Sequence, residues 1–218
     1  KIIEDDKITF MFGIPVMFLL MTQVPEFETT DYSSVRFFIA GGAPCPRPLI
    51  ETWLTHGITF NQGYGMTETA TAITALRTED ALRKLGSCGK PVFHTDIRIL
   101  DSEGNVLPRG EMGEVWVKGP NVLREYWQLP EATAESITDG WLHTGDMGYI
   151  DDEGYLFLVD RRKDMYISGG ENVYPAEIED VLMACEKIAD AGVIGIPDDK
   201  WGEVGLAVVV PTPGVKVD

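Results

Sequence analysis

The stretch "NQGYGMTETA", from Asn61 to Ala70, carries within a few positions the residue types that a nucleotide site needs. Its two glycines would let the backbone approach a ligand, and Tyr64 could stack on a flat ring. Thr67 could donate a hydrogen bond to a phosphate, and the carboxylate of Glu68 could hold Mg²⁺. A second interpretation is a strand-to-helix turn in which Thr67 or Thr69 is a cap. The spacing alone does not separate the two.

A second group of such residues lies later in the chain. Asp146 follows a glycine in "WLHTGD", and a lone carboxylate can accept hydrogen bonds from both hydroxyls of a ribose. "DRRKD" carries Arg161 and Lys163, and "SGGEN" places Gly169 beside Gly170. Each motif also has a simpler interpretation: a turn aspartate, a solvated charged face and a hairpin turn, respectively. The sequence has no Walker phosphate loop, GxGxxG or HExxH motif.

An α/β rhythm predicts the elements that position the first group. Val35–Ala40 is a continuous apolar run, which is typical of a buried parallel strand. A Gly-Gly-Ala-Pro turn follows, then a helix over about Pro46–Leu54 and a short strand at Ile58–Asn61. Strand, glycine turn, helix and strand make a βαβ unit, and ligands bind at the carboxyl ends of such strands.

The character of the sequence changes near residue 86 and again near Lys163. Short strands broken by Asp, Ser, Gly and Asn turns predict an antiparallel, barrel-like part that extends to about residue 160. "YPAEIEDVLMACE" then predicts a helix opened by Pro175. Two strands are expected after it, near Ala191–Ile196 and Gly205–Pro211.

These elements predict an α/β fold. A βαβ unit and a barrel-like subdomain form the end of a larger domain, and a small α+β domain follows. The final block is short for an independent core, so we expect it to be truncated. The expected parts are residues 1–85, 86–162 and 163–218.

Composition limits the class of protein. An apolar share of 44% with 24% charged residues is that of a soluble globular protein. The net charge of −17 argues against a nucleic-acid partner, because a phosphate backbone would be repelled. It leaves a nucleotide possible, since ATP needs only a few local donors and a magnesium ion.

Three further features bear on location and on acidic clusters. The apolar run Phe10–Met21 is shorter than the roughly 20 residues of a membrane-spanning helix, so it is interpreted as buried core. The cysteines are odd in number and far apart, which favours a reducing, cytoplasmic setting. We expect the acidic side chains of Asp151, Asp152 and Glu153 to be solvated in a turn.

Four motifs in order, "GGAP", "YGMTE", "GWLHTGD" and "DRRKDMYISGGENVYPAEIE", resemble the adenylate-forming superfamily, and most closely its acyl-CoA synthetase branch. The resemblance covers essentially the whole chain. It implies that a carboxylate attacks the α-phosphate of MgATP to give an acyl-adenylate and pyrophosphate. The small C-terminal domain then swings, and the thiol of coenzyme A displaces AMP. Fatty acids are the leading expectation for the acid, with aryl and short dicarboxylic acids open.

The same resemblance implies a set of site residues. The glycine turn and Tyr64 would line the adenine pocket, Thr67 would contact phosphate and Glu68 would bind Mg²⁺. Asp146 would hold the ribose hydroxyls, and Arg161 would also reach the nucleotide. The full implied set is Gly41, Gly42, Ala43, Pro44, Tyr64, Gly65, Thr67, Glu68, Asp146, Arg161, Lys163, Ser168, Gly169 and Gly170.

The C-terminal members of that set would serve the thioester step. Lys163 matches the hinge position of the family. Ser168, Gly169 and Gly170 would form the loop that lines the pantetheine channel after rotation. Two glycines suit that role, because a side chain there would block the approach of the thiol.

Two parts of the family pattern are missing. The Ser/Thr/Gly-rich phosphate loop belongs upstream of the matched region. The catalytic lysine near the family's C-terminus belongs beyond Asp218, and Lys216 has the wrong neighbours. We therefore expect an internal piece of a longer enzyme, and we expect that these 218 residues alone form no acyl-adenylate.

Other functions remain open at this stage. An adenylating enzyme with an acceptor other than coenzyme A is the nearest, although the "SGGEN" loop argues against it. A nucleotide-binding remnant without catalysis is a second alternative. A purely structural protein fits poorly with four ordered site motifs.

Overall fold

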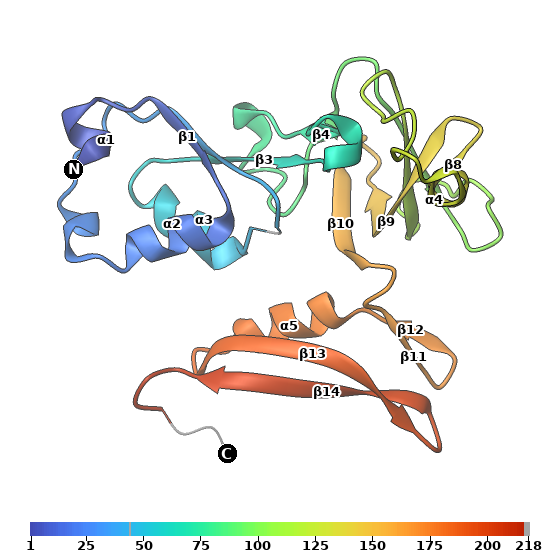
Figure 1. Ribbon diagram of the computed structural model, residues 1–218. Coiled ribbons are helices and arrows are strands. Elements are labelled where there is room, and N and C mark those ends of the chain that lie inside the picture. The colour runs from blue at the N-terminus through green and yellow to red at the C-terminus, as the bar shows by residue number, and fades with distance from the viewer. Residues whose placement is uncertain (44, 216–218) are drawn as a thin grey trace. The chain divides into compact units, whose positions relative to one another are not determined.

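The computed structural model describes residues 1–43 and 45–215, and its first sheet has five strands. Strands β1 (Phe10–Gly13), β2 (Phe37–Ala40) and β3 (Phe60–Tyr64) run parallel, and β4 (Thr74–Ala75) and β5 (Lys90–Pro91) add antiparallel pairs. Helices α2 (Pro15–Thr22) and α3 (Arg47–Leu54) follow β1 and β2 and cover one face of the parallel strands (Figure 1). The predicted βαβ unit is therefore confirmed as β2, α3 and β3.

An aromatic cluster fixes these two helices to the sheet. Phe18 of α2 and Trp53 of α3 are fully buried against Phe38 of β2. The ring centroid of Phe38 lies 5.0 Å from that of Phe18 and 4.9 Å from that of Trp53. Burying each such side chain stabilises the fold by about 1.5–3 kcal/mol. The helices consequently hold the carboxyl ends of the parallel strands in place.

A second sheet is antiparallel and has the order β10-β9-β7-β6. Its strands are β6 (Asp96–Leu100), β7 (Gly113–Lys118), β9 (Trp141–Ile150) and β10 (Leu156–Arg161), and the short β8 (Ile137–Thr138) pairs with β9. Ile73, Ile99, Val115, Val117 and Leu156 form its buried core. A bridge between Gly89 and Leu156 connects it to the end of the first sheet.

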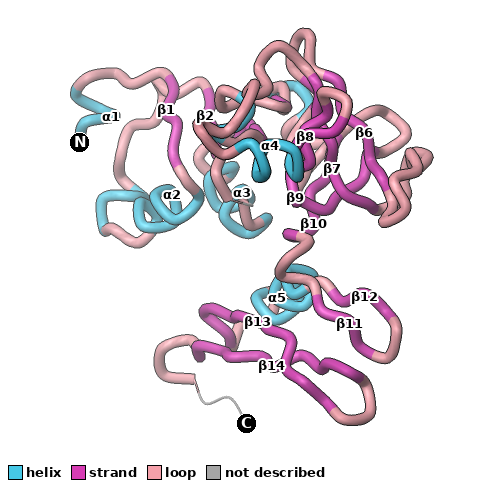
Figure 2. The backbone as a smooth tube through the Cα atoms, turned by 45° about the vertical axis from the view of Figure 1, so that its right-hand side comes forward, coloured by secondary structure: helices cyan, strands magenta, loops and turns pink. Residues whose placement is uncertain are grey.

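Up to residue 215, the C-terminal part contains one helix and a four-stranded sheet of order β12-β11-β14-β13. The bounds are β11 (Tyr166–Ser168), β12 (Glu171–Val173), α5 (Pro175–Met183), β13 (Ile188–Asp198) and β14 (Gly202–Pro211). Helix α5 begins at Pro175 as predicted and packs along β13 (Figure 2). Both final strands are longer than predicted, because they pair with each other over almost their full lengths.

The remaining helical elements are short. They are α1 (Ile2–Asp5) and α4 (Pro130–Ser136), with 3₁₀ turns η1 (Pro25–Glu28), η2 (Thr67–Thr69) and η3 (Thr78–Asp80). The whole arrangement is the α/β class that the sequence predicts.

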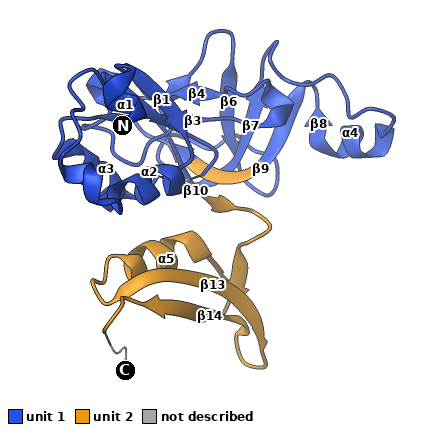
Figure 3. Cartoon of the chain, turned by 60° about the vertical axis from the view of Figure 1, so that its left-hand side comes forward, with its two compact units in different colours: residues 1–144, 149–158 blue, residues 145–148, 159–218 orange. Residues whose placement is uncertain are grey.

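The chain divides into two compact units, which Figure 3 colours separately. The first contains residues 1–144 and 149–158, and the second contains residues 145–148 and everything after 158. The middle of β9 therefore belongs with the C-terminal part. The predicted boundaries after residues 85 and 162 stay predictions.

The apolar run Phe10–Met21 corrects one expectation. It is divided between β1 and α2, because Pro15 starts the helix. Phe18 is buried, but Phe12 and Leu20 are 63% and 56% exposed, so the run is only partly core. Within the described part of the chain, no helix has the length and apolar character needed to cross a membrane.

Candidate functional site

The first group of candidate residues begins where the parallel strands end. Gly41 follows β2, and its backbone N–H donates to the carbonyl oxygen of Gly13, at the end of β1, over 3.2 Å. A Cβ on Gly41 would lie 3.1 Å from the Phe12 ring and 3.6 Å from the carbonyl oxygen of Gly63. The ends of β1 and β2 therefore meet close to Gly63 of β3 at one sheet edge, where α/β folds bind ligands, although Gly13 and Gly41 are themselves buried.

The rest of the glycine turn leads away from this edge. Gly42 has a φ of +82°, a conformation that favours glycine. Gly42 and Ala43 are exposed. Pro44, the last predicted residue of this turn, lies outside the described residues.

The loop after β3 has a tightly constrained backbone. A Cβ on Gly65 would lie 1.7 Å from the carbonyl oxygen of Thr71, so no larger residue fits there. Ala70 and Thr71 themselves have positive φ angles. The Thr69 hydroxyl accepts from the Met66 N–H over 3.2 Å and donates to the Met66 carbonyl over 3.0 Å. The capping interpretation is thus confirmed for Thr69.

Thr69 differs from its neighbours in exposure. It is fully buried, whereas Thr67 is exposed on the same 3₁₀ turn. Tyr64 is partly buried and packs against the core of the second sheet. The hydroxyl of Thr67 is therefore the one that a ligand can reach.

Glu68 is held by the segment that follows β7. Its backbone carbonyl accepts from Leu123 N–H over 2.7 Å, and its Oε1 accepts from the Tyr126 hydroxyl over 3.1 Å. Partial burial and then the adjacent Glu68 carboxylate raise the pKa of Tyr126. The tyrosine consequently keeps its proton and donates it to this hydrogen bond.

Asn121 adds a second attachment to the same loop. Its side-chain amide donates to the carbonyls of Ala72, over 2.8 Å, and Thr69, over 3.3 Å. Neither Asn121 nor Tyr126 was recognised from the sequence. Tyr126 lies 58 positions from Glu68, and no local pattern relates the two.

The donor atoms in this loop fit a magnesium ion. Glu68 offers a carboxylate and Thr67 a hydroxyl, and both are hard oxygen ligands. Among the described residues, no group of three or more His, Cys, Asp or Glu side chains could hold a metal by itself. Mg²⁺ suits such a site, because it keeps several waters and is bound by one or two carboxylates together with substrate phosphates.

The second group lies in the C-terminal unit. Asp146 on β9 and Arg161 on β10 come together, with Arg161 Nε 3.6 Å from Asp146 Oδ1. The Asp146 side chain is only 16% exposed, and that of Arg161 is 64% exposed. Arg162 N–H donates to the Gly145 carbonyl over 2.8 Å and fixes the backbone beside Asp146. The structure thus places two predicted nucleotide contacts next to each other.

Lys163 lies in a hydrogen-bonded turn directly after β10. The N–H groups of Asp164 and Met165 both donate to the Arg161 carbonyl, over 3.0 Å and 3.3 Å. Lys163 is exposed and lines a cavity of about 390 Å³ together with Asp160 and Glu179. Its position between β10 and β11 is that of a connecting segment.

The paired glycines form the turn between β11 and β12. Gly169 and Gly170 have φ angles of +61° and +92°, the combination that a two-residue hairpin turn requires. A Cβ on Gly169 would lie 2.8 Å from the Trp201 ring, and Gly169 N–H donates to the Trp201 carbonyl over 2.8 Å. Ser168, next to them, is half-buried. The hairpin interpretation of this motif is confirmed.

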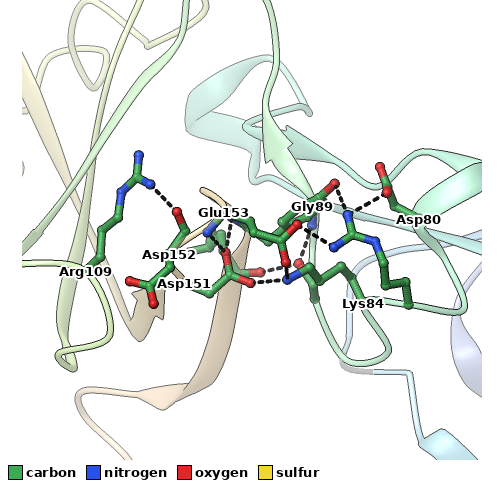
Figure 4. Close-up of polar contacts among 11 residues, drawn as sticks. Asp80, Lys84, Gly89, Arg109, Asp151, Asp152 and Glu153 are labelled. Atoms are coloured by element: carbon green, nitrogen blue, oxygen red, sulfur yellow. Dashed lines mark hydrogen bonds and ion pairs between the residues drawn. The ribbon is translucent and has the colours of Figure 1, made fainter.

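The acidic turn after β9 differs from the prediction. Lys84 Nζ lies 2.6 Å from Asp151 Oδ2 and 2.5 Å from Glu153 Oε1 (Figure 4). Arg83 contacts Glu153 and Asp80, over 2.5 Å and 2.8 Å. Expecting solvated side chains was wrong for Asp151, whose side chain is 20% exposed and pairs with Lys84, 67 positions upstream. Asp152 and Glu153 are exposed as expected, although Glu153 also pairs with basic residues.

The same pairs shift the pKa values of their members. Burial alone would raise the pKa of Asp151, but the Lys84 ammonium lowers it below its usual value of 3.8. The hydrogen bonds from Lys84 and Arg83 lower the pKa of Glu153, and the two carboxylates raise the pKa of Lys84. This cluster attaches the segment after β4 to the turn between β9 and β10, so its evident role is structural.

Comparison with known families matches both units. Residues 1–127 match the model described as "AMP-binding enzyme", and residues 177–218 match "AMP-binding enzyme C-terminal domain". A feruloyl-CoA synthase from Amycolatopsis sp. is 47% identical over 216 residues, which are 99% of this chain and 44% of that protein. The long-chain-fatty-acid–CoA ligase FadD13 of Mycobacterium tuberculosis is 46% identical over 210 residues, 96% of this chain and 42% of the ligase.

A solved structure shares the fold. The o-succinylbenzoate CoA synthetase of Bacillus subtilis, in complex with its acyl-adenylate intermediate, superposes with a TM-score of 0.88 at 42% identity. The match covers 98% of this chain and 43% of the synthetase. The same synthetase has been solved with ATP and a magnesium ion. The chain thus spans less than half the length of each of these relatives.

Proposed function

Because this chain belongs to the AMP-binding enzyme family, we propose that the protein is an ATP-dependent carboxylate–CoA ligase. The observation that carries the proposal is the similarity over nearly the whole chain to enzymes named as ligases of coenzyme A, at 46–47% identity. Those enzymes act on different acids. What they have in common is the joining of a carboxylate to the thiol of coenzyme A.

In the first half-reaction, a carboxylate oxygen of the acid attacks the α-phosphorus of ATP. A bond to phosphorus forms, the α–β bridging bond breaks, and pyrophosphate leaves. We assign Tyr64 and the glycine turn after β2 to the adenine, and Asp146 to the two ribose hydroxyls. Arg161, which contacts Asp146, would bring positive charge toward the phosphates. Such chemistry relies on positioning and on neutralising charge.

Thr67 and Glu68 would bind the phosphates of ATP and their magnesium ion. The exposed Thr67 hydroxyl would donate to a phosphate oxygen, and Glu68 would hold Mg²⁺ through a carboxylate oxygen. A bound magnesium ion would neutralise charge on the phosphates. The close packing at Gly65 and Gly41 would keep the backbone at this sheet edge fixed beside the nucleotide.

In the second half-reaction, the sulfur of coenzyme A attacks the acyl carbonyl, and AMP leaves with the electron pair of the broken C–O bond. We assign the connecting turn at Lys163 to the hinge that exchanges one half-reaction for the other. The β11–β12 turn, Gly169–Gly170 with Ser168 before it, would line the channel for the pantetheine thiol. The hairpin geometry supports this at Gly170, where no atom lies within 4 Å of the position a Cβ would take.

The identity of the carboxylic acid that is joined to coenzyme A is a separate proposal. A fatty acid is the leading choice, supported by the similarity to a long-chain-fatty-acid–CoA ligase. An aryl acid has equal support from the feruloyl-CoA synthase. We also propose a cytoplasmic setting, supported by the odd and scattered cysteines.

Carboxylate-dependent exchange of pyrophosphate into ATP tests the proposal. The full-length protein is assayed with fatty, aryl and dicarboxylic acids, and thioester formation is then followed with coenzyme A. Exchange with one class of acid, followed by its thioester, is the expected result. Exchange without any thioester would favour an acceptor other than coenzyme A. No exchange with any acid, in folded protein, would contradict adenylation.

A further inference from the structure

The carboxylate of Glu68 has little freedom despite its place on a surface loop. Its own turn is fixed by the Thr69 cap and by the close packing at Gly65. A glutamate side chain has three rotatable bonds, and ordering it costs up to about 2 kcal/mol of conformational entropy. A carboxylate that is already ordered loses less entropy when it binds a metal ion. Here the Tyr126 hydroxyl orders the Glu68 carboxylate.

Two hydrogen bonds reach Glu68 from one segment. Leu123 N–H donates to its backbone carbonyl over 2.7 Å, and the Tyr126 hydroxyl donates to Oε1 over 3.1 Å. The first fixes the backbone of the loop and the second fixes the end of the side chain. The tyrosine engages only one of the two carboxylate oxygens.

Tyr126 is itself firmly held by the start of α4. Its N–H donates to the Thr133 hydroxyl over 2.9 Å, and its carbonyl accepts from Leu129 N–H over 3.0 Å. A short helix with no other assigned role therefore anchors a tyrosine that points at a candidate metal ligand.

We propose that Tyr126 is a positioning residue that orients the Glu68 carboxylate for the magnesium–nucleotide complex. The inference rests on the proposed function, because it presumes that Glu68 binds Mg²⁺. Partners that orient a metal ligand contribute about 10- to 100-fold to metal affinity. The Tyr126 hydroxyl should therefore set how strongly magnesium assists nucleotide binding, while nucleotide binding without magnesium should not depend on it.

A purely structural role for the tyrosine makes a different prediction. The loop is already attached by the Asn121 amide and by Leu123 N–H, and neither contact involves the tyrosine hydroxyl. Removing the hydroxyl in Tyr126→Phe keeps the ring. If the hydroxyl only stabilised the fold, the variant would melt earlier and would bind every nucleotide less well.

The test uses titration calorimetry of the full-length protein with α,β-methylene-ATP, which cannot be adenylated. Dissociation constants are measured with saturating Mg²⁺ and with EDTA, and their ratio is the magnesium coupling. AMP with EDTA and the thermal midpoint are measured in parallel. The variants are Tyr126→Phe, Glu68→Gln and the double variant. Tyr149→Phe, whose ring stacks on Phe157, is the matched control.

The expected result is a coupling about 10-fold smaller in Tyr126→Phe, with AMP affinity and the thermal midpoint unchanged. Glu68→Gln should lose most of the coupling, and the double variant should be no weaker than Glu68→Gln alone. Wild-type coupling in Tyr126→Phe, or an equal loss for AMP and MgATP analogue, would overturn the positioning role alone. Full coupling in Glu68→Gln, or none in the wild type, would overturn the proposed role of Glu68 and this inference with it.

Discussion

Replacing Asp146 by alanine should separate nucleotide binding from folding. In the proposed complex the carboxylate accepts two hydrogen bonds from the ribose. Losing two bonds to a charged acceptor should cost about 2–4 kcal/mol. That corresponds to about 30- to 1000-fold in the dissociation constant of AMP.

The effect on stability should be much smaller. The ion pair between Asp146 and Arg161 has an N–O separation of 3.6 Å, and the Arg161 side chain is 64% exposed. An ion pair this long, with its basic partner exposed to solvent, contributes about 0–1 kcal/mol. We therefore expect the thermal midpoint of Asp146→Ala to stay close to that of the wild type while AMP affinity falls.

Titration calorimetry with AMP, without metal, measures the binding term directly. Asp152→Ala is a control for the loss of one negative charge, because Asp152 is exposed and its contact with Arg109 uses its backbone carbonyl. Asp146→Asn keeps the shape and removes the charge, so it should fall between the wild type and the alanine variant. Unchanged AMP affinity in Asp146→Ala would refute the ribose assignment.

Three further outcomes follow from other parts of the molecule. Gly65→Ala should destabilise the protein by about 3 kcal/mol in urea unfolding, since its Cβ would lie 1.7 Å from the Thr71 carbonyl oxygen. Gly63→Ala is the control, because its Cβ would lie 3.5 Å from the Thr74 carbonyl oxygen. Lys163→Pro should spare pyrophosphate exchange but slow thioester formation, and equal loss of both steps would count against a hinge. Lys84 lowers the folded-state pKa of Asp151 below 3.8, so their pair stabilises the fold above that pH and is lost as pH falls. The thermal midpoint should therefore drop between about pH 5 and about pH 3, and less so in Asp151→Asn.

Local patterns predicted two helices, α3 and α5, but missed α1, α2 and α4, and they predicted the strand bounds less well. Helix α3 at Arg47–Leu54 and helix α5 at Pro175–Met183 begin next to prolines, which mark helix starts in the sequence. The strand expected at Ile58–Asn61 is instead β3, Phe60–Tyr64. Its register is set by pairing with β2, where Ala40 lies opposite Gln62, and such pairing cannot be read from a short segment.

Long-range polar contacts could not be predicted at all. The pair of Lys84 with Asp151 spans 67 positions, and that of Tyr126 with Glu68 spans 58. Each member alone looks like an ordinary surface residue. Only the fold shows that Lys84 is nearly enclosed by two carboxylates, or that Tyr126 points at Glu68.

The candidate residues fall into two classes that mutation can distinguish. Gly65 and Gly169 are required by the backbone, because a Cβ would strike a carbonyl oxygen in one case and a tryptophan ring in the other. Glu68 and Asp146 satisfy no such constraint, and the fold would tolerate their neutral counterparts. Substitutions in the first class should lower stability whether or not a nucleotide binds. Substitutions in the second should lower nucleotide affinity at constant stability, and a carboxylate that instead changed stability would belong to the fold rather than to the site.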